Sequence, residues 1–225
     1  MYRKKWDKYD TENKIKFIEA NRDSLFHKLY IDFVKANPDI SHILEVGPGL
    51  AVEYSEIKKI RALKYEVLEI SKCFIEYCQK TYPEIHIING MIETFDNPLV
   101  EYDLIRVCDV FEHTAPIQSA IKNTINCAKR FHITMFKWMS NGSKLGDSEI
   151  HIDSDNNSYY STRFPLMRVI DEIQLYGMID SIIIVDELCK TVLLFREHWY
   201  RHRFEALSSH PSARGLRCII TGRRK

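Results

Sequence analysis

The sequence predicts an α/β protein in which a mostly parallel β-sheet is flanked by helices. Three observations support this prediction: short apolar segments alternate with amphipathic ones, a glycine turn follows the first apolar segment, and an acidic residue ends the second. Because right-handed crossovers place the carboxyl ends of parallel strands at one edge, we expect the ligand site there. The expected strands cover residues 43–46, 65–70, 85–88, 102–110, 131–136 and 181–185, and the expected helices cover 12–36, 51–63, 72–81, 116–130 and 164–176.

The composition narrows the class of protein. The chain has 225 residues, of which 45% are hydrophobic and 28% charged, so it can bury a sizeable core. Lys and Arg number 32 against 31 Asp and Glu, and the resulting net charge of +1 argues against a strongly basic nucleic-acid coat. The six cysteines form no Cys-x-x-Cys pair, and no apolar stretch approaches the roughly 20 residues that span a bilayer. We therefore expect a cytoplasmic protein with reduced thiols.

The turn after the first expected strand is the most informative segment. Glu45 is followed by Gly47-Pro48-Gly49, and glycines at this place let the backbone approach a ligand closely. About twenty residues later, Glu69 ends the second strand, where a carboxylate can accept both hydroxyls of a ribose. A dinucleotide fingerprint would need Gly or Ala where Val52 stands, so an NAD-dependent enzyme is the weaker alternative.

These segments, taken in order, resemble the motifs of class I S-adenosylmethionine-dependent methyltransferases. The first motif is an acidic residue followed by G-x-G-x-G, with Ala51 in place of the last glycine here, and residues 65–71 and 102–113 are similar to the second-strand and fourth-strand motifs. The resemblance implies a Rossmann-like fold with a mostly parallel seven-stranded sheet and helices on both faces. It also implies cofactor contacts from Glu45, Gly47, Pro48, Gly49, Glu69, Ile70, Met91, Ile92 and Asp109.

One residue departs from the family pattern at the end of the third strand. The family commonly has Gly-Asp there, with the Asp reaching the adenine amino group, whereas this chain has Gly90-Met91. We expect backbone N–H groups of Met91 and Ile92 to face the edge of the ring instead, with the polarizable Met side chain against it.

The resemblance implies methyl transfer to an oxygen or nitrogen nucleophile, for which His113 and His151 are the candidate bases. Some ubiquinone-pathway and small-RNA O-methyltransferases hold a divalent metal with Glu-x-x-Glu-His. Asp109-x-x-Glu112-His113 resembles that sequence, and His151 could supply a further ligand. Because metal-free relatives also carry D-V-x-E-H, we expect no metal.

The family pattern suggests one domain over residues 1–225, with a helical cap at 1–38, a cofactor-binding core at 39–188 and a basic segment at 189–225. The last segment interleaves arginines with aromatic residues, and residues 216–222 resemble the family's terminal antiparallel strand. We expect a small-molecule acceptor. A protein or RNA acceptor bound through the basic segment, a metal-dependent RNA O-methyltransferase, and a non-catalytic partner or RNA-binding module are the alternatives.

Overall fold

The structure is a computed structural model that describes most of the central part of the chain. It describes residues 16, 23–95, 100–135, 138–139, 149–152, 158–161, 164–186, 191–196 and 216–225. Within these residues, no helix is both long and apolar enough to cross a membrane.

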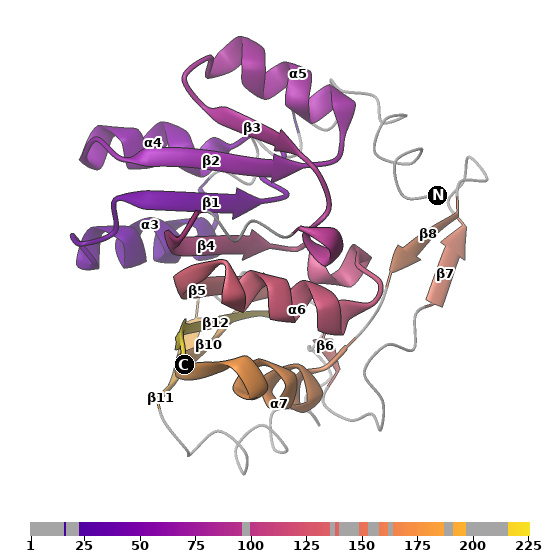
Figure 1. The fold of residues 1–225 in the computed structure, drawn as a ribbon. Helices are drawn as coiled ribbons and strands as arrows, with labels where there is room; N and C mark the ends of the chain where they lie inside the picture. The colour runs from indigo at the N-terminus through magenta and orange to yellow at the C-terminus, as the bar shows by residue number, and fades with distance from the viewer. Residues whose placement is uncertain are drawn as a thin grey trace.

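An eight-stranded sheet organises the molecule (Figure 1). Its order is β11-β10-β12-β5-β4-β1-β2-β3, and the pairs among β1 to β5 are parallel. β12 runs antiparallel to both of its neighbours, β5 and β10, so β10 points the same way as β1 to β5. The strands are β1 (His42–Val46), β2 (Lys64–Glu69), β3 (His86–Asn89), β4 (Tyr102–Cys108), β5 (Ala128–Met135), β10 (Gly177–Asp186), β11 (Thr191–Arg196) and β12 (Leu216–Arg224).

The mostly parallel Rossmann-like sheet is therefore confirmed, with one addition. The seven expected strands are present, and β11 pairs antiparallel with β10 as an eighth strand at the edge. The sequence shows an apolar run at this position, but its pairing depends on a connection, residues 187–190, that carries no clear turn signal. The final strand expected at 216–222 is β12, which extends to Arg224.

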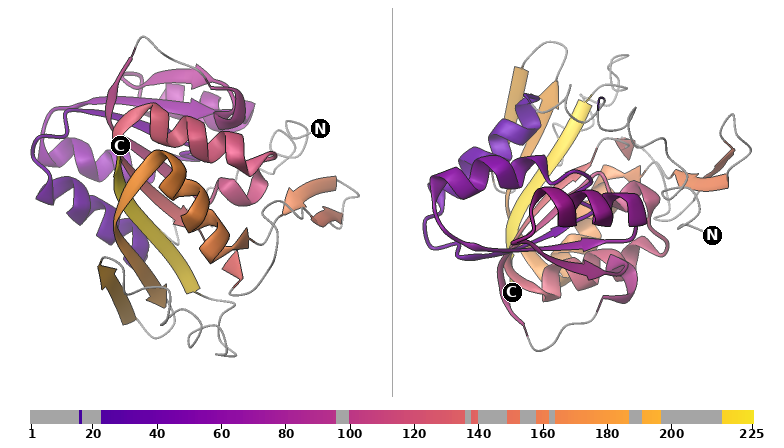
Figure 2. Two further views of the ribbon diagram at one scale, coloured as in Figure 1. Left: turned by 60° about the horizontal axis from the view of Figure 1, so that its bottom comes forward. Right: turned by 90° about the horizontal axis from the view of Figure 1, so that it is seen from above.

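Helices cover both faces of the sheet (Figure 2). On one face, α3 (Leu25–Ala36), α4 (Val52–Ile60) and α5 (Lys72–Thr81) pack on a buried cluster that includes Ile43, Tyr65 and Val67. On the other face, α6 (Ile117–Asn126) and α7 (Leu166–Tyr176) pack on a cluster that includes Leu44 and Val46. Since successive side chains of a strand point to opposite faces, each central strand supplies both clusters.

The part of the N-terminal region that is described belongs to this layered core. Tyr30 and Val34 of α3 are fully buried against the sheet, and no residue of α3 lines the pocket described below. The sequence predicts a helix over 12–36, and its first part lies outside the described residues apart from Lys16. The division into cap, core and basic segment stays a prediction.

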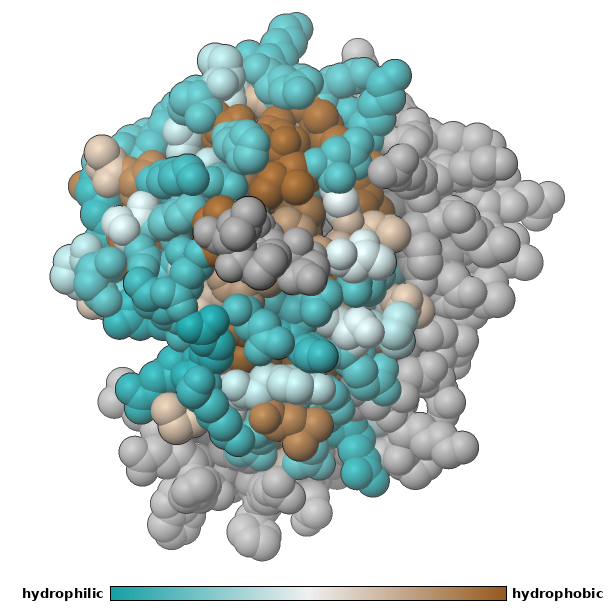
Figure 3. All heavy atoms as spheres, in the orientation of Figure 1, coloured by the Kyte–Doolittle hydropathy of each residue, from teal (hydrophilic) through white to brown (hydrophobic). Residues whose placement is uncertain are grey.

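Short strands lie between β5 and α7. β6 (Trp138–Met139) pairs with β9 (Phe164–Pro165), and β7 (Glu149–Ile152) pairs with β8 (Ser158–Ser161) as a hairpin. Residues of β8 lie next to η2 (Phe111–His113), the short 3₁₀ helix after β4. A second 3₁₀ helix, η1 (Ile92–Thr94), follows β3. Figure 3 shows a mostly hydrophilic face whose largest apolar area lies over β2 and β3, with smaller apolar patches elsewhere.

Candidate functional site

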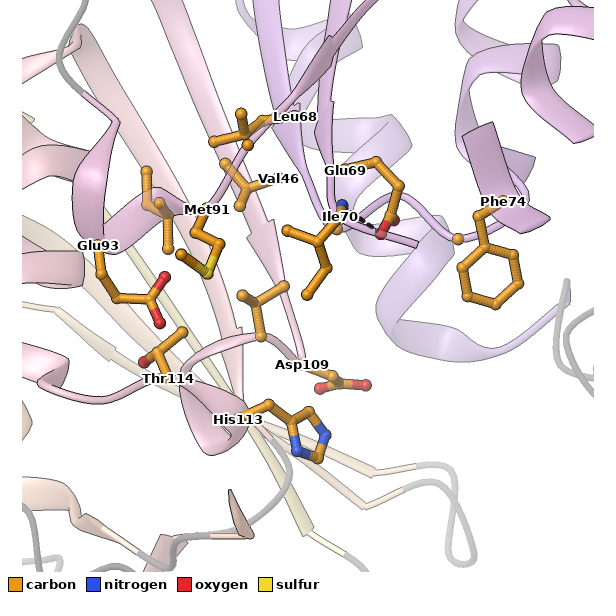
Figure 4. A pocket seen from close by; sticks show the side chains of 15 residues that line it. Val46, Leu68, Glu69, Ile70, Phe74, Met91, Glu93, Asp109, His113 and Thr114 are labelled. Atoms are coloured by element: carbon orange, nitrogen blue, oxygen red, sulfur yellow. Dashed lines mark hydrogen bonds between the residues drawn. The ribbon is translucent and has the colours of Figure 1, made fainter. Parts of the chain in front are cut away.

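A pocket opens where β1, β2, β3 and β4 end, at the edge of the sheet that the sequence predicts for the ligand (Figure 4). Its empty volume is about 660 Å³, counting the part open to solvent. The lining residues are Val46, Gly47, Gly49, Leu68, Glu69, Ile70, Phe74, Gly90, Met91, Ile92, Glu93, Asp109, Val110, His113 and Thr114.

The glycine turn forms the floor of the pocket beside β1. Gly47 and Gly49 have φ angles of 63° and 57°, the left-handed region in which glycine avoids the strain of other residues. The N–H of Gly47 donates to the carbonyl of Leu68 at 2.9 Å, which joins the turn to β2. A Cβ at Gly47 would lie 2.5 Å from Cγ2 of Val110, another lining residue. The pocket therefore requires glycine at this position.

Ala51 takes the place of the family's third glycine, and it too has a positive φ, 48°. Its N–H donates to the carbonyl of Pro48 at 2.9 Å, and its side chain is buried at the start of α4. The backbone thus keeps the conformation that glycine favours, at a cost of about 1–2 kcal/mol for an L-residue. The departure from the motif leaves the shape of the turn in place.

Glu69 is held rigidly at the end of β2. Its Oε1 accepts hydrogen bonds from the N–H groups of Ile70 and Ser71, both at 2.8 Å, and the residue is 6% exposed. Figure 4 shows its side chain beside Ile70 and on the same side of the pocket as Phe74. A fixed carboxylate beside an apolar wall can receive hydroxyl groups of a ligand without further reorganisation.

Asp109 lies across the pocket, just after β4. Its φ is 54°, and its N–H donates to the carbonyl of Thr134 at 2.9 Å. Oδ2 forms an ion pair with Arg217 of β12, whereas Oδ1 is buried and has no hydrogen-bond partner within the described part of the chain. Burial raises the pKa of Asp109, while the charge of Arg217 acts in the opposite direction. Asp109 thus lines the pocket and keeps one carboxylate oxygen without a hydrogen-bond partner among the described residues.

Glu93, His113 and Thr114 close the pocket on the side of η1 and η2. Oε1 of Glu93 accepts a hydrogen bond from the N–H of Ala115 at 3.3 Å, and burial raises the pKa of this carboxyl group. Met91 stands between Glu93 and Ile70 in the view of Figure 4 and keeps 36% of its surface exposed. An apolar slot thus separates two carboxylates, Glu93 and Glu69.

The charges of the lining have one dominant sign. Glu69, Glu93 and Asp109 are acidic, His113 is the one imidazole, and the described lining residues include no Lys or Arg. A pocket of this kind favours a ligand with hydroxyl groups and positive charge, and disfavours the phosphates of a dinucleotide.

Glu45 was expected to contact the cofactor, but it lies outside the pocket lining. It is 1% exposed, and its carboxylate accepts a hydrogen bond from the Tyr65 hydroxyl at 2.5 Å. Because Val46 points to the opposite face of β1, it reaches the pocket while Glu45 faces α4. Burial, followed by the charge of Glu53, raises the pKa of Glu45 to about 8. The structure therefore places Glu45 on the face of β1 away from the pocket, hydrogen-bonded to β2.

Glu45 belongs to a buried polar cluster around Arg106, on the sheet face under α3 and α4. Arg106 is fully buried, donates to Oγ1 of Thr134 at 2.6 Å and lies 3.5 Å from Oε1 of Glu53. His27 of α3 contacts the same Glu53 oxygen at 2.5 Å. Although burial opposes the charged form, the hydrogen bond from His27 and the charges of His27 and Arg106 lower the pKa of Glu53 to about 2. The cluster gives several polar partners to Arg106, a buried cation on β4, the strand that Asp109 follows, although its Nε has no hydrogen-bond partner within the described part of the chain.

The structure brings together most of the residues expected at the site. Gly47, Gly49, Glu69, Ile70, Met91, Ile92, Asp109 and His113 all line the pocket. Pro48 belongs to the turn but is not among the lining residues, and the side chain of His151 lies outside what the structure describes. Whether His113 and His151 act as bases stays a prediction.

Several lining residues were not expected from the sequence. Phe74 is on the helix after Glu69, and Glu93 and Thr114 follow the third and fourth strands by a few residues. Their signal in the sequence was position alone, since each lies near a strand end on the ligand side of the sheet. Glu112 of the alternative metal motif is fully buried outside the lining, and the described residues hold no group of three or more His, Cys, Asp or Glu arranged to bind a metal.

The fold and the pocket together define a Rossmann-like α/β protein with a pocket at the carboxyl ends of its parallel strands. Solved structures of methyltransferases share this fold. The N-terminal domain of EvdMO1 with S-adenosylhomocysteine bound matches with a TM-score of 0.61 and 13% identity, over 88% of this chain and 81% of that one. The N-methyltransferase NodS from Bradyrhizobium japonicum, also in complex with S-adenosylhomocysteine, matches with a TM-score of 0.56 and 13% identity, over 91% of this chain and 90% of that one.

A TehB-like S-adenosylmethionine-dependent methyltransferase from Corynebacterium glutamicum matches with a TM-score of 0.61 and 10% identity, over 96% of this chain and 98% of that one. No protein-family model and no curated protein sequence matches the chain. The chain has the fold of the class I S-adenosylmethionine-dependent methyltransferases, and the resemblance stated from its motifs is confirmed at the level of fold.

Proposed function

We propose that this chain is an S-adenosylmethionine-dependent methyltransferase. The observation that carries the proposal is the pocket itself: a glycine turn, an apolar slot and three carboxylates meet at the carboxyl ends of the strands, with no basic residue among the described lining. S-adenosylmethionine has a ribose, an α-ammonium group and a sulfonium, so its hydroxyls and positive charges match this lining. The phosphates of NAD would meet like charge there.

The residues present fit the parts of this cofactor. Glu69 would accept the ribose hydroxyls, since its carboxylate is already fixed by two backbone N–H groups. Ile70 and Met91 would flank the base in the apolar slot. Asp109, whose Oδ1 lacks a partner, would accept a hydrogen bond from the α-ammonium group. Backbone at Gly47 and Gly49 would lie against the amino-acid part.

When bound, S-adenosylmethionine supplies an electrophilic methyl carbon on a positively charged sulfur. The protein's part is then to align an acceptor with that carbon and to exclude water. His113 lines the pocket on the side of η2 and would take the proton that an oxygen or nitrogen acceptor loses. Residues of β8 lie next to η2, which carries His113, so the β7–β8 hairpin is the nearest described element that could cover an acceptor.

We infer that the acceptor is a small molecule. The basic residues of β12 support this choice over RNA, because they already have acidic partners: Arg217 pairs with Asp109, Arg223 with Asp180, and Arg224 with Glu101. Fewer free cations are then left on this strand for phosphates. Lys225, which follows β12, donates to the carbonyl of Gln174 at 2.6 Å. The other arginines of the expected RNA surface lie in 197–215, outside the described residues, or at Arg196, whose side chain is not described.

Calorimetric titration with S-adenosylmethionine tests the proposal. The wild-type protein should bind it and should not bind NAD. Glu69→Ala should weaken binding by about tenfold to a hundredfold, because hydrogen bonds from ribose hydroxyls to a charged acceptor are lost. Glu56→Ala is the matched control, since Glu56 lies on the surface of α4 and pairs with Lys59. Unchanged affinity in Glu69→Ala would remove the ribose assignment, and no binding to wild-type protein would remove the cofactor.

A further inference from the structure

Arg217 is the residue of the pocket region that the proposed function does not use. It comes from β12, 108 residues after Asp109, and its Nη1 donates to Oδ2 of Asp109. Both side chains are 23% exposed, so the pair is mostly shielded from solvent. An ion pair shielded in this way is stronger than one on the surface, because water competes less for its charges.

The rest of the structure fixes Arg217 in turn. β12 lies between β5 and β10. Arg217 pairs with Val185 of β10, and the next residue, Cys218, pairs with Met135 of β5, so the sheet restrains the backbone of Arg217. Its guanidinium carbon lies 3.9 Å above the ring centre of Phe26 in α3, a cation–π geometry that holds the group on the side facing Asp109. The Asp109 backbone is fixed separately, by the bond to the carbonyl of Thr134.

The consequence for Asp109 is that its two oxygens are not equivalent. Arg217 occupies Oδ2, while Oδ1 is buried without a partner among the described residues. A free carboxylate would rotate about χ2 and present either oxygen to a ligand. With one oxygen fixed, the other has a defined direction before any ligand arrives, which lowers the cost of ordering on binding.

We propose that Arg217 is a positioning residue that holds Asp109 so that Oδ1 receives the α-ammonium group of the cofactor. This inference rests on the proposed function, because it needs a ligand with that group. Arg217 itself does not touch the ligand, since it is not among the pocket-lining residues. The pair also cancels part of the negative charge of the lining, and the charge of Arg217 favours the ionised form of Asp109 beside two other carboxylates.

Among the charged groups around Asp109, Arg217 is the one that most favours the ionised form of its carboxyl group. Arg106 and Cys108 of β4, Glu112 and His113 of η2, and His27 of α3 are the other titratable groups in its surroundings. Burial alone raises the pKa of Asp109, and Arg217 is the first of the opposing causes. Without Arg217, the carboxyl group should take up a proton at a higher pH than in the wild type.

Two ligands distinguish a positioning role of Arg217 from a purely structural one. S-adenosylhomocysteine carries the α-ammonium group, whereas 5′-methylthioadenosine has the same nucleoside and sulfur without the amino-acid part. By calorimetry, Arg217→Met should lower the affinity for S-adenosylhomocysteine at least tenfold. Its affinity for 5′-methylthioadenosine should stay within about twofold of the wild-type value. The matched control is Arg223→Met on the same strand, whose side chain is 60% exposed and pairs with Asp180; it should change neither ligand.

The pH profile gives a second readout. For Arg217→Met, S-adenosylhomocysteine affinity should fall as the pH is lowered from 8 to 6, more steeply than for the wild type, because Asp109 protonates. Arg217→Lys should restore part of the affinity, since it returns the charge but not the fork geometry. The double variant Arg217→Met/Asp109→Asn should lose less binding free energy for S-adenosylhomocysteine than the sum of the losses in the two single variants, because both changes remove the same contact.

The outcomes are distinguishable. Equal weakening of both ligands in Arg217→Met would show a structural role and overturn the proposal, as would unchanged binding of S-adenosylhomocysteine. If the wild-type protein binds neither ligand, the proposed function itself fails. If Arg217→Met does not fold, Arg217→Lys still decides, because its two affinities can be compared in the same way.

Discussion

At the scale of single residues, the pocket depends on backbone conformations that few side chains allow. Gly47, Gly49 and Ala51 all have positive φ, and the turn alternates these with ordinary residues. Gly47 has the additional limit of Val110, whose Cγ2 would lie 2.5 Å from a Cβ placed there. Strain and crowding therefore act on the same residue, and both bear on the floor of the pocket.

Gly47→Ala should weaken S-adenosylmethionine binding at least tenfold and lower the free energy of unfolding by about 1–2 kcal/mol, because the new methyl group must displace Val110 at an unfavourable φ. Calorimetry and urea unfolding measure the two effects. Gly90→Ala is the comparison: its Cβ would lie 3.1 Å from the flexible end of Leu68, without a positive φ, so its effect should be smaller. Adding Val110→Ala to Gly47→Ala should recover part of the affinity, and no recovery would argue against the steric cause.

At the scale of elements, Glu66 joins four parallel strands at the edge opposite the pocket. It accepts hydrogen bonds from the side chains of His42 at 3.0 Å, His86 at 3.2 Å and Tyr102 at 3.1 Å, which begin β1, β3 and β4. Lys64 of the same strand adds an ion pair at 2.5 Å. Although burial opposes the charged form, the hydrogen bonds from Lys64, His86, His42 and Tyr102 lower the pKa of Glu66 to about 2.

A carboxylate whose pKa is lower in the folded state stabilises the fold at pH values above its unfolded-state pKa. That contribution is lost as the pH falls toward its folded-state pKa. Glu66→Gln should therefore destabilise the protein by about 1–2 kcal/mol at pH 7 and by less near pH 3. Urea unfolding at both pH values tests this. Glu56→Gln, on an exposed helix surface, should stay within about 0.5 kcal/mol of the wild type at either pH. A difference that does not shrink on acidification would exclude ionisation as the cause.

The helices and strands of the core follow closely from the sequence pattern. The alternation of apolar strands and amphipathic helices predicted β1 to β5 and α4 to α6 within a few residues, because both faces of a parallel sheet must be covered. The glycine turn and Glu69 followed from spacing along one βαβ unit. The motif position of Glu45 predicts a cofactor contact, but Glu45 does not line the pocket. Successive side chains of β1 point to opposite faces, and Val46 is the one on the pocket side.

Contacts between distant segments could not be predicted in the same way. Nothing near Asp109 in the sequence indicates Arg217, and the pairing exists only because β12 lies between β5 and β10. Glu93 likewise reaches the pocket through the 3₁₀ turn of η1, a short element with a weak sequence pattern. The sequence therefore predicted the floor of the pocket and one wall, and the tertiary structure supplied the rest.

At the scale of the whole molecule, a ligand that binds the folded state alone should stabilise the entire sheet. At a concentration one hundred times Kd, binding contributes about 2.7 kcal/mol, which for a chain of this size corresponds to a rise in Tm of roughly 5–10 °C. Thermal unfolding with S-adenosylmethionine should show this rise, and with NAD none. A rise with NAD and none with S-adenosylmethionine would reverse the assignment of the pocket.

The central position of β12 has a consequence for how the protein reaches its active form. The pairings among β1 to β5 span shorter stretches of chain, the longest being β1 with β4 (Ile43 with Leu104). Arg217 and Asp109 are 108 residues apart and meet only when β12 has added to β5. Such long-range closure is slow compared with local pairing, because much chain entropy is lost before new contacts form. During refolding, selectivity for a ligand with an α-ammonium group should therefore arise no earlier than the insertion of this strand, even if the nucleoside part of the pocket forms sooner.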